Sequence, residues 1–320
     1  MPLTFDMPLE KLYTYMGRNP RPADFDQYWD TALAEMHAID PKIELVKHNI
    51  DAPCAECYHL YFTGVGGARI HAKYLKPKGI SEPHPAVLQF HGYSGHSGDW
   101  SDKLNYVARG YSVFALDARG QGGLSEDVGG VIGNTQNGHI IRGLDDAPEK
   151  LLFRQIFLDC AELANIAMGM PEVDPERVGA TGGSQGGALT LACAALEPRI
   201  KRAAPVFPFL CDYQRIWEMD MAERAYAELK SYFRWFDPCH EHEDQVFLKL
   251  GYIDNQHLAS RIRAEILMGV GLMDNVCPPS TQFAAYNKIT STKQLAIYPD
   301  FGHEGLPGMN DKIYNFMAGL

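Results

Sequence analysis

The sequence predicts an α/β fold in which a mostly parallel sheet is covered by helices on both faces. From residue 85 onward, short continuous apolar runs alternate with segments of helical character, and such runs are typical of strands buried on both faces. The runs occupy residues 86–90, 111–116, 178–181, 202–206, 266–271 and 294–298. A glycine-rich stretch directly follows the third run and leads into small apolar residues, which predicts a sharp turn from strand to helix.

The N-terminal part of the chain is predicted to form helices and then a β-hairpin. Apolar residues recur at helical spacing within residues 9–39. Two strand-like segments at residues 57–62 and 68–75 flank the glycine-rich residues 63–67, a pattern that indicates a hairpin. We therefore expect an N-terminal antiparallel extension at one edge of the sheet.

Two segments interrupt the alternation of strands and helices. Residues 120–143 are rich in glycine and lack periodicity, which predicts a long loop excursion, and loops of this kind are usually functional or lie at interfaces. Residues 209–262 are polar, aromatic-rich and helical in pattern. They predict a cap-like insertion over the carboxyl ends of the strands, where ligands bind in such sheets. The whole chain, 1–320, is expected to form a single domain.

The composition is typical of a globular protein with a large core, since 46% of the 320 residues are hydrophobic and 22% are charged. A formal net charge of −11 argues against nucleic acid or an anionic membrane as a partner, because both require a basic face. We find no signal-peptide pattern and no apolar stretch of the ~18 residues that a membrane span needs. Seven scattered cysteines favour the reducing cytoplasm, and the Cys54–Cys57 pair is interpreted as incidental.

Ser184 lies in the sequence Gly-Gly-Ser-Gln-Gly-Gly, directly after a strand-like run and before a helix-like segment. This context matches the G-x-S-x-G nucleophile elbow of the α/β-hydrolase fold. The turn is strained, so side chains at Gly182 or Gly186 would collide with the neighbouring strand and helix. A phosphate-binding loop would need Gly-Lys-Ser/Thr, which is absent, and a dinucleotide site would need a different glycine spacing. We therefore interpret Ser184 as a nucleophile.

A serine nucleophile needs a histidine base, and the base needs an orienting carboxylate. In α/β-hydrolases these partners follow the serine in the order acid, then histidine. Asp274 comes immediately after the fifth apolar run and His303 immediately after the sixth, as Ser184 follows the third. We therefore predict a catalytic triad of these three residues. Other histidines after Ser184 fall within the polar helical insertion, namely His240, His242 and His257.

The oxyanion of an acyl-transfer reaction needs two preorganised backbone N–H groups. Gln185 follows the nucleophile and is expected to supply one of them. The loop after residues 86–90 resembles the His-Gly loop of lipases and esterases, which makes the N–H of Tyr93 the other donor. We interpret His91 as a structural support of that loop. The substrate pocket is expected near Tyr93, Phe207 and Pro208.

Residues 239–244, with the sequence Cys-His-Glu-His-Glu-Asp, superficially resemble a metal site. A metalloprotease helix needs His-Glu-x-x-His so that both histidines share one face, and this spacing is absent. We interpret the segment as a solvated polar face and predict neither a metal nor another cofactor.

Further motifs resemble those of one enzyme family. Residues 119–121 read Arg-Gly-Gln, residues 182–186 read Gly-Gly-Ser-Gln-Gly, and residues 303–304 read His-Glu. Together they resemble the RGQ, GxSQG and HE signature of carbohydrate esterase family 7, the acetyl xylan esterases and cephalosporin C deacetylases. The resemblance spans essentially the whole chain and includes residues 22–29 and 138–146.

The resemblance implies a metal-free deacetylase of small substrates, such as short acetylated xylooligosaccharides and the 3'-acetyl group of cephalosporin C. It also implies a homo-hexamer, a dimer of trimers, with residues 120–143 as an oligomer contact. Arg119, Gln121 and Glu304 are implied to support the catalytic framework. Two alternatives remain open at this point: an amidase or peptidase with the same triad, and a hydrolase-like binding scaffold without activity.

Overall fold

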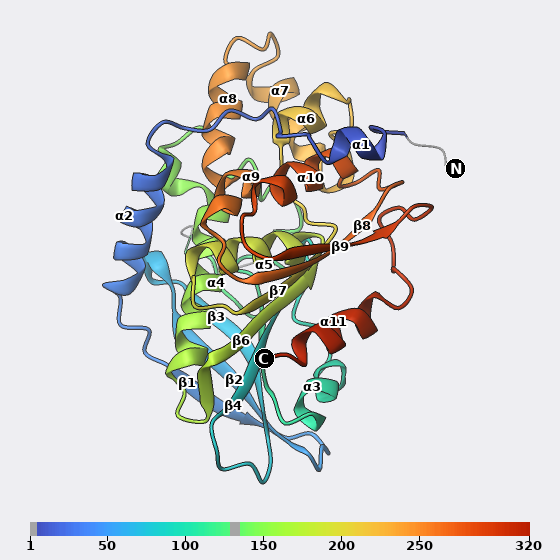
Figure 1. Ribbon diagram of the computed structural model, residues 1–320. Coiled ribbons are helices and arrows are strands. Elements are labelled where there is room, and N and C mark those ends of the chain that lie inside the picture. Colours follow the sequence, from blue (N-terminus) through green and yellow to red (C-terminus); the bar gives the residue numbers. More distant parts are fainter. Residues whose placement is uncertain (1–4, 129–134) are drawn as a thin grey trace.

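The computed structural model describes residues 5–128 and 135–320 and contains one large twisted sheet (Figure 1). The described strands form a nine-stranded sheet in the order β1-β2-β3-β5-β4-β6-β7-β8-β9. They are β1 (Glu44–His48), β2 (Ala55–Thr63), β3 (Arg69–Pro77), β4 (His84–Phe90), β5 (Ser112–Leu116), β6 (Val173–Gly183), β7 (Arg202–Val206), β8 (Glu265–Gly271) and β9 (Lys293–Tyr298). Pairing is antiparallel from β1 to β5 and parallel from β5 through β4 to β9. The predicted mostly parallel α/β sheet is confirmed, and β1 is an additional edge strand that the sequence pattern did not indicate.

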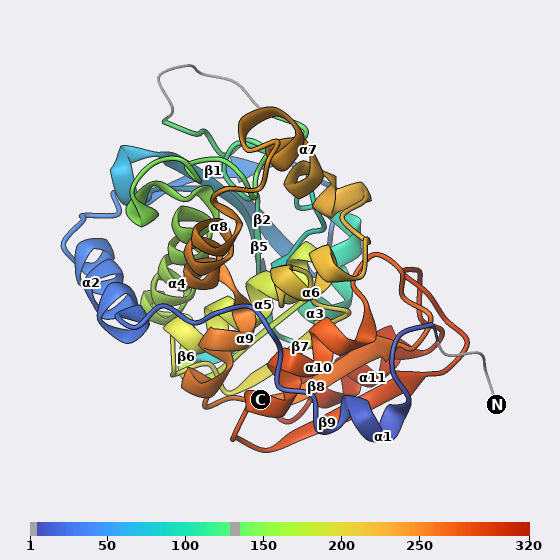
Figure 2. The ribbon, with the colours of Figure 1, turned by 90° about the horizontal axis from the view of Figure 1, so that it is seen from above.

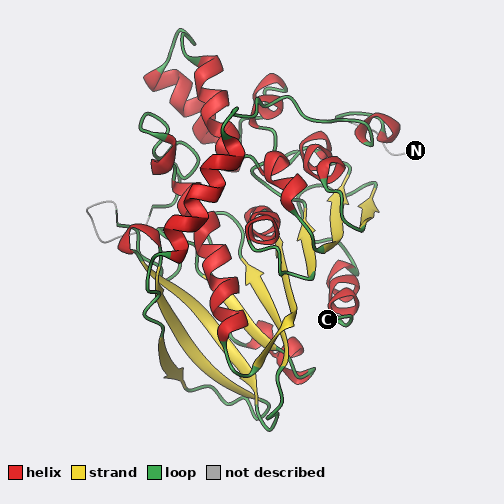
Figure 3. Ribbon diagram, turned by 60° about the vertical axis from the view of Figure 1, so that its left-hand side comes forward, coloured by secondary structure: helices red, strands yellow, loops and turns green. Residues whose placement is uncertain are grey.

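Helices cover both faces of this sheet (Figure 3). The described α-helices are α1 (Leu9–Leu12), α2 (Phe25–His37), α3 (Leu104–Ala108), α4 (Leu152–Gly169), α5 (Gln185–Leu196), α6 (Tyr213–Glu218), α7 (Ala227–Phe236), α8 (Glu243–Leu250), α9 (Asn255–Leu258), α10 (Pro279–Lys288) and α11 (Met309–Met317). The larger buried cluster contains side chains of α2, α4 and α5, and the smaller one contains side chains of α3 and α11. None of the helices in the described ranges is long and apolar enough to cross a bilayer.

The helix that follows the elbow, α5, is rich in glycine and alanine and is buried along its whole length. Every residue of α5 is buried, and its glycine and alanine residues allow the backbone to approach β6 and β7 closely. By contrast, α2 buries one face, at Phe25, Tyr28, Trp29, Ala32 and Met36, the spacing of an amphipathic surface helix. This packing fixes the start of α5 relative to the ends of the central strands.

The helices α6 to α9 lie between β7 and β8 in the chain, and α6, α7 and α8 rise above the carboxyl ends of the central strands (Figure 1). The N-terminal segment passes from α1, beside α10, across the molecule to α2, beside α4 (Figure 2). Of the predicted excursion at 120–143, residues 129–134 lie outside the described residues, and the described remainder contains turns but no helix or strand.

Candidate active site

Ser184 occupies a strained turn between β6 and α5. Its backbone has φ 58° and ψ −119°, a conformation that non-glycine residues rarely adopt outside functional sites. The flanking glycines are required by space: a Cβ on Gly182 would lie 2.6 Å from the carbonyl oxygens of Phe90 and Gly186. A Cβ on Gly186 would overlap the Phe90 oxygen even more closely. The strand, turn and helix of a nucleophile elbow are therefore all present.

The three residues predicted as a triad meet at the carboxyl edge of the sheet. His303 Nε2 lies 2.9 Å from Ser184 Oγ, and His303 Nδ1 lies 2.9 Å from Asp274 Oδ2. Asp274 follows β8 and is fully buried, whereas His303 follows β9 and is part-buried. With Asp274 as acceptor, the neutral imidazole carries its proton on Nδ1 and presents a free lone pair to the serine hydroxyl.

Asp274 is held by further hydrogen bonds. Its Oδ1 accepts the backbone N–H groups of Val276 at 2.9 Å and Cys277 at 2.8 Å. The amide of Gln282 donates to Oδ2 at 3.3 Å. These donors stabilise the ionised carboxylate in a buried place, which is the state that can orient and stabilise an imidazolium. Gln282 is a site residue that sequence reasoning did not anticipate.

The predicted oxyanion donors lie on the two segments that meet at the elbow. Gln185 is the first residue of α5, so its N–H belongs to the helix-terminal donors that lack an intrahelical acceptor. Tyr93 lies in the loop after β4, and the glycine contacts described above show that the elbow packs against the start of this loop. Both ring nitrogens of His91 bond to backbone, to the Ala118 N–H at 2.9 Å and the Gly92 oxygen at 2.7 Å. Its contacts are those of a loop support.

Arg119 and Gln121 each form a buried side-chain pair, and the pair of Gln121 reaches the elbow through Gln185. Gln121 and Gln185 exchange amide hydrogen bonds of 2.8 and 2.9 Å. Arg119 forms a bidentate pair with Asp159, with N–O distances of 2.7 and 2.6 Å, and also donates to the Val65 oxygen. Asp159 comes from α4, and nothing in its local sequence distinguishes it. Glu304 is exposed and accepts the Gly302 N–H at 3.1 Å.

Glu228 of α7 connects the helical insertion to the loop after β4 that contains Tyr93. One of its carboxylate oxygens accepts the Tyr93 hydroxyl, and the other accepts the Ile140 and Ile141 N–H groups at 2.6 and 3.1 Å. Burial raises the pKa of Glu228, against the effect of these hydrogen bonds. The sequence offered no signal for this contact, because Glu228 lies 135 residues from Tyr93.

The two residues predicted to bind substrate have different surroundings. The ring of Phe207 packs on His303 with centroids 4.5 Å apart, and its backbone has a positive φ of 32°. Pro208 is buried, and its backbone lies 3.0 Å from the position of a Cβ on Gly187. Phe207 therefore borders the triad, whereas the backbone of Pro208 packs beside the start of α5.

The two metal-like motifs contain no ligand cluster. Cys54 is exposed and Cys57 is buried, and both are free thiols. His240 bonds to Glu243 at 2.9 Å in the segment 239–244. Within residues 5–128 and 135–320, no group of three or more His, Cys, Asp or Glu side chains is arranged to hold a metal ion.

The chain is similar to proteins with a common activity in their names. The acetyl xylan esterase family (AXE1) matches residues 1–320. The crystal structure of acetyl xylan esterase 1 from Thermoanaerobacterium sp. JW/SL YS485 is 62% identical, with a TM-score of 0.96 over 98% of this chain and 99% of that one. The acetyl xylan esterase from Paenibacillus sp. R4 is 37% identical, with a TM-score of 0.92 over the same shares of the two chains.

A curated relative, the acetyl esterase Axe7A of Xylanibacter ruminicola, is 26% identical over 303 residues, which is 92% of this chain. The chain spans 65% of the length of that relative. The family match over the full chain and the two similar structures agree with the RGQ, GxSQG and HE motifs and with an α/β-hydrolase-like fold. The chain belongs to the acetyl xylan esterase family of carboxylic ester hydrolases.

Proposed function

We propose that this protein is a serine esterase that removes acetyl groups from small substrates, among them short acetylated xylooligosaccharides and the 3'-acetyl group of cephalosporin C. The observation that carries the proposal is the pair of 2.9 Å contacts that join the His303 ring to Ser184 and to Asp274. Hydrogen-bonded nucleophile, base and orienting acid are the arrangement that activates a serine for acyl transfer.

In the first half-reaction, Ser184 Oγ attacks the acetyl carbonyl carbon while its proton moves to His303 Nε2. Asp274 holds the imidazole in position and stabilises the positive charge that it gains. The N–H groups of Gln185 and Tyr93 donate to the carbonyl oxygen as it becomes negative. The bond between carbonyl carbon and alcohol oxygen then breaks, and the departing alcohol takes the proton from His303 Nε2.

In the second half-reaction, water attacks the acetyl group on Ser184 and gives a proton to His303. The carbon–oxygen bond to Ser184 breaks, Ser184 recovers its proton from His303, and the product leaves as acetic acid, which releases its remaining proton to water to give acetate. Ester and amide cleavage share this machinery, so the triad alone does not select the acetyl ester. The choice of acetyl esters rests on the family and on the names of the two similar structures.

We further propose a cytoplasmic homo-hexamer built as a dimer of trimers. The seven cysteines are all free, which suits a reducing compartment. Large apolar side chains are exposed on the tip of α7, where Trp235 is 76% and Phe236 is 66% accessible, and in the excursion at Leu124 and Val128. Exposed apolar side chains at these positions are candidates for burial between subunits. Analytical ultracentrifugation tests this proposal, and a monomer at working concentrations would contradict it.

A substrate panel tests the esterase proposal. We expect kcat/KM to be highest for p-nitrophenyl acetate and for acetylated xylooligosaccharides, to fall for longer acyl chains, and to be lowest for amino-acid anilides. Ser184→Ala should lower kcat by about 10⁴-fold or more, whereas Ser231→Ala, on the exposed side of α7, should leave it unchanged. A preference for anilides would identify an amidase instead. A folded protein without turnover on any of these substrates would indicate a binding scaffold.

A further inference from the structure

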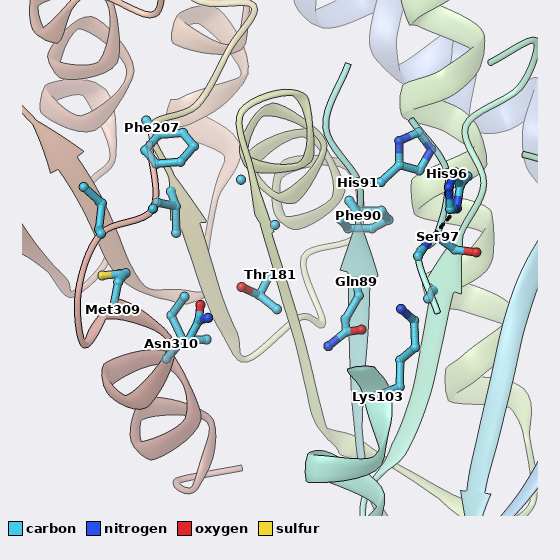
Figure 4. A pocket seen from close by; sticks show the side chains of 18 of the residues that line it. Gln89, Phe90, His91, His96, Ser97, Lys103, Thr181, Phe207, Met309 and Asn310 are labelled. Atoms are coloured by element: carbon cyan, nitrogen blue, oxygen red, sulfur yellow. Dashed lines mark hydrogen bonds between the residues drawn. The ribbon is translucent and has the colours of Figure 1, made fainter. Parts of the chain in front are cut away.

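A cavity lies on the face of the sheet that α3 and α11 cover (Figure 4). Its volume is about 650 Å³, within the range of small-molecule sites. Strands β4, β5, β6 and β7 contribute one wall, and residues 96–98, Lys103 and residues 305–310 contribute the others. Neither Ser184 nor His303 is among the described residues that line it. The cavity is therefore distinct from the candidate triad.

The surface of this cavity is mostly apolar, and Lys103 is the only lysine, arginine, aspartate or glutamate among the described residues that line it. The apolar residues include Phe90, Val206, Phe207, Leu306, Met309 and Ile313. Lys103 is only 4% exposed, and its side chain extends into the cavity that Gln89 and Thr181 also line (Figure 4). Burying an ammonium among apolar groups is costly unless an anion accompanies it.

Among the described residues, no side chain forms a hydrogen bond or an ion pair with this ammonium. Asp99, Asp102 and Asp117 act on Lys103 electrostatically, but none of the described carboxylates forms an ion pair with it. Its Nζ lies 3.2 Å from the position of a Cβ on Gly98, yet the Gly98 carbonyl accepts a hydrogen bond from Lys73. Burial lowers the pKa of Lys103, and the nearby positive charge of Lys73 lowers it further.

The side-chain amide of Gln89 is likewise without a hydrogen bond among the described residues, although it lines the same cavity. We propose that this cavity binds a small organic monocarboxylate, with the carboxylate on Lys103 and Gln89 and the apolar body against α11. A single ammonium suits a single carboxylate, whereas a phosphate dianion would bury a second charge without a partner. The apolar walls favour an acid with several methylene groups over acetate.

The cavity shares walls with the candidate active site. Phe207 lines it and packs on the ring of His303, and Gly183 directly precedes the nucleophile. A binding test must therefore separate the two places. The proposal does not rest on the esterase reaction, because binding is measured without turnover.

Isothermal titration calorimetry with hexanoate tests the proposal. We expect one-to-one binding, weaker binding of shorter acids by about fourfold per methylene removed, and much weaker binding of the neutral hexanamide. Lys103→Met should weaken hexanoate binding about ten- to a hundredfold. Gln89→Leu is a second variant that reports on the same site if Lys103→Met does not fold.

Two controls locate the site. Lys312→Met removes the same charge from an exposed position on α11, and Ser184→Ala alters only the candidate active site. Both should bind hexanoate as the unaltered protein does. The proposal is wrong if hexanoate does not bind saturably, if hexanamide binds equally well, or if binding survives both cavity substitutions. Loss of binding in Ser184→Ala would place the carboxylate at the serine and would also overturn it.

Discussion

The contact between Glu228 and Tyr93 predicts that a residue of the helical insertion controls catalysis without touching the substrate. Glu228 accepts three hydrogen bonds, from the Tyr93 hydroxyl and from the N–H groups of Ile140 and Ile141. Glu228→Gln preserves the shape but replaces one accepting oxygen by an NH₂ group that faces the tyrosine hydroxyl. The Tyr93 loop then loses a charge-assisted bond to the insertion.

The expected size of the effect follows from these bonds. A hydrogen bond to a charged group contributes about 1.5–3 kcal/mol and a neutral one about 0.5–1.5, so each of the three bonds weakens by about 1 kcal/mol. Complete loss of one oxyanion donor costs about 10²–10³-fold in kcat. Partial displacement of the Tyr93 N–H should therefore lower kcat about 10- to 100-fold. KM should change less, because the oxyanion forms in the transition state and the tetrahedral intermediate and is absent from the bound substrate.

Steady-state kinetics on an acetyl ester across pH measure this effect. Because burial raises the pKa of Glu228, the carboxylate protonates at a less acidic pH than a free glutamate, and the unaltered enzyme should lose activity there. Glu228→Gln should lack that acid limb. Tyr93→Phe should lower kcat comparably, and the double variant should be little worse than either single one. Glu223→Gln, an exposed position in the same insertion, is the matched control. An unchanged kcat and pH profile in Glu228→Gln would refute the reasoning.

Three further predictions concern the framework. Gly186→Ala drives a Cβ into the Phe90 carbonyl and should cost about 1–3 kcal/mol or more of stability together with nearly all activity, whereas Gly169→Ala, with open space around it, should be tolerated in thermal unfolding. Arg119→Lys loses the bidentate pair with Asp159 and should lower the free energy of unfolding in urea by about 1–3 kcal/mol. Arg177→Lys, which alters a surface pair, should lower it by less than about 0.5 kcal/mol, and equal effects of the two substitutions would contradict this prediction. Burial lowers the pKa of His257 to about 3. The contribution of the neutral His257 ring to folding stability is therefore present above the unfolded pKa of about 6.5, and it is lost as the pH falls toward the folded pKa. Between pH 7 and pH 5 the unaltered protein should lose about 2 kcal/mol that His257→Gln does not lose, and parallel pH dependences would count against this.

The central sheet was predictable because its strands are buried on both faces and their sequences are continuously apolar. The edge strand β1 was not, since Glu44–His48 is largely exposed and carries no alternating pattern. The start of β6 was also placed too late, because Val173–Gly183 begins with polar and proline residues that lack a strand signal.

The candidate triad was predictable because strand order converts positions along the chain into positions along one edge of the sheet. Ser184, Asp274 and His303 each follow a strand, and parallel strands end together. Asp159, Glu228 and Gln282 were not predictable, since each acts through a tertiary contact with a residue whose distance in space the sequence does not encode. Glu228 meets Ile140 across 88 residues, and no local pattern marks either partner.

The central claim is that Ser184 carries the acetyl group between the two half-reactions. Rapid acid quench of the enzyme during turnover of an acetyl ester, followed by peptide mass spectrometry, tests it directly. We predict one added acetyl group on the peptide that contains Ser184, and none on that peptide in Ser184→Ala. His303→Ala should form this species far more slowly. Full turnover by Ser184→Ala, or an acetyl group on any other residue in its place, would contradict the account.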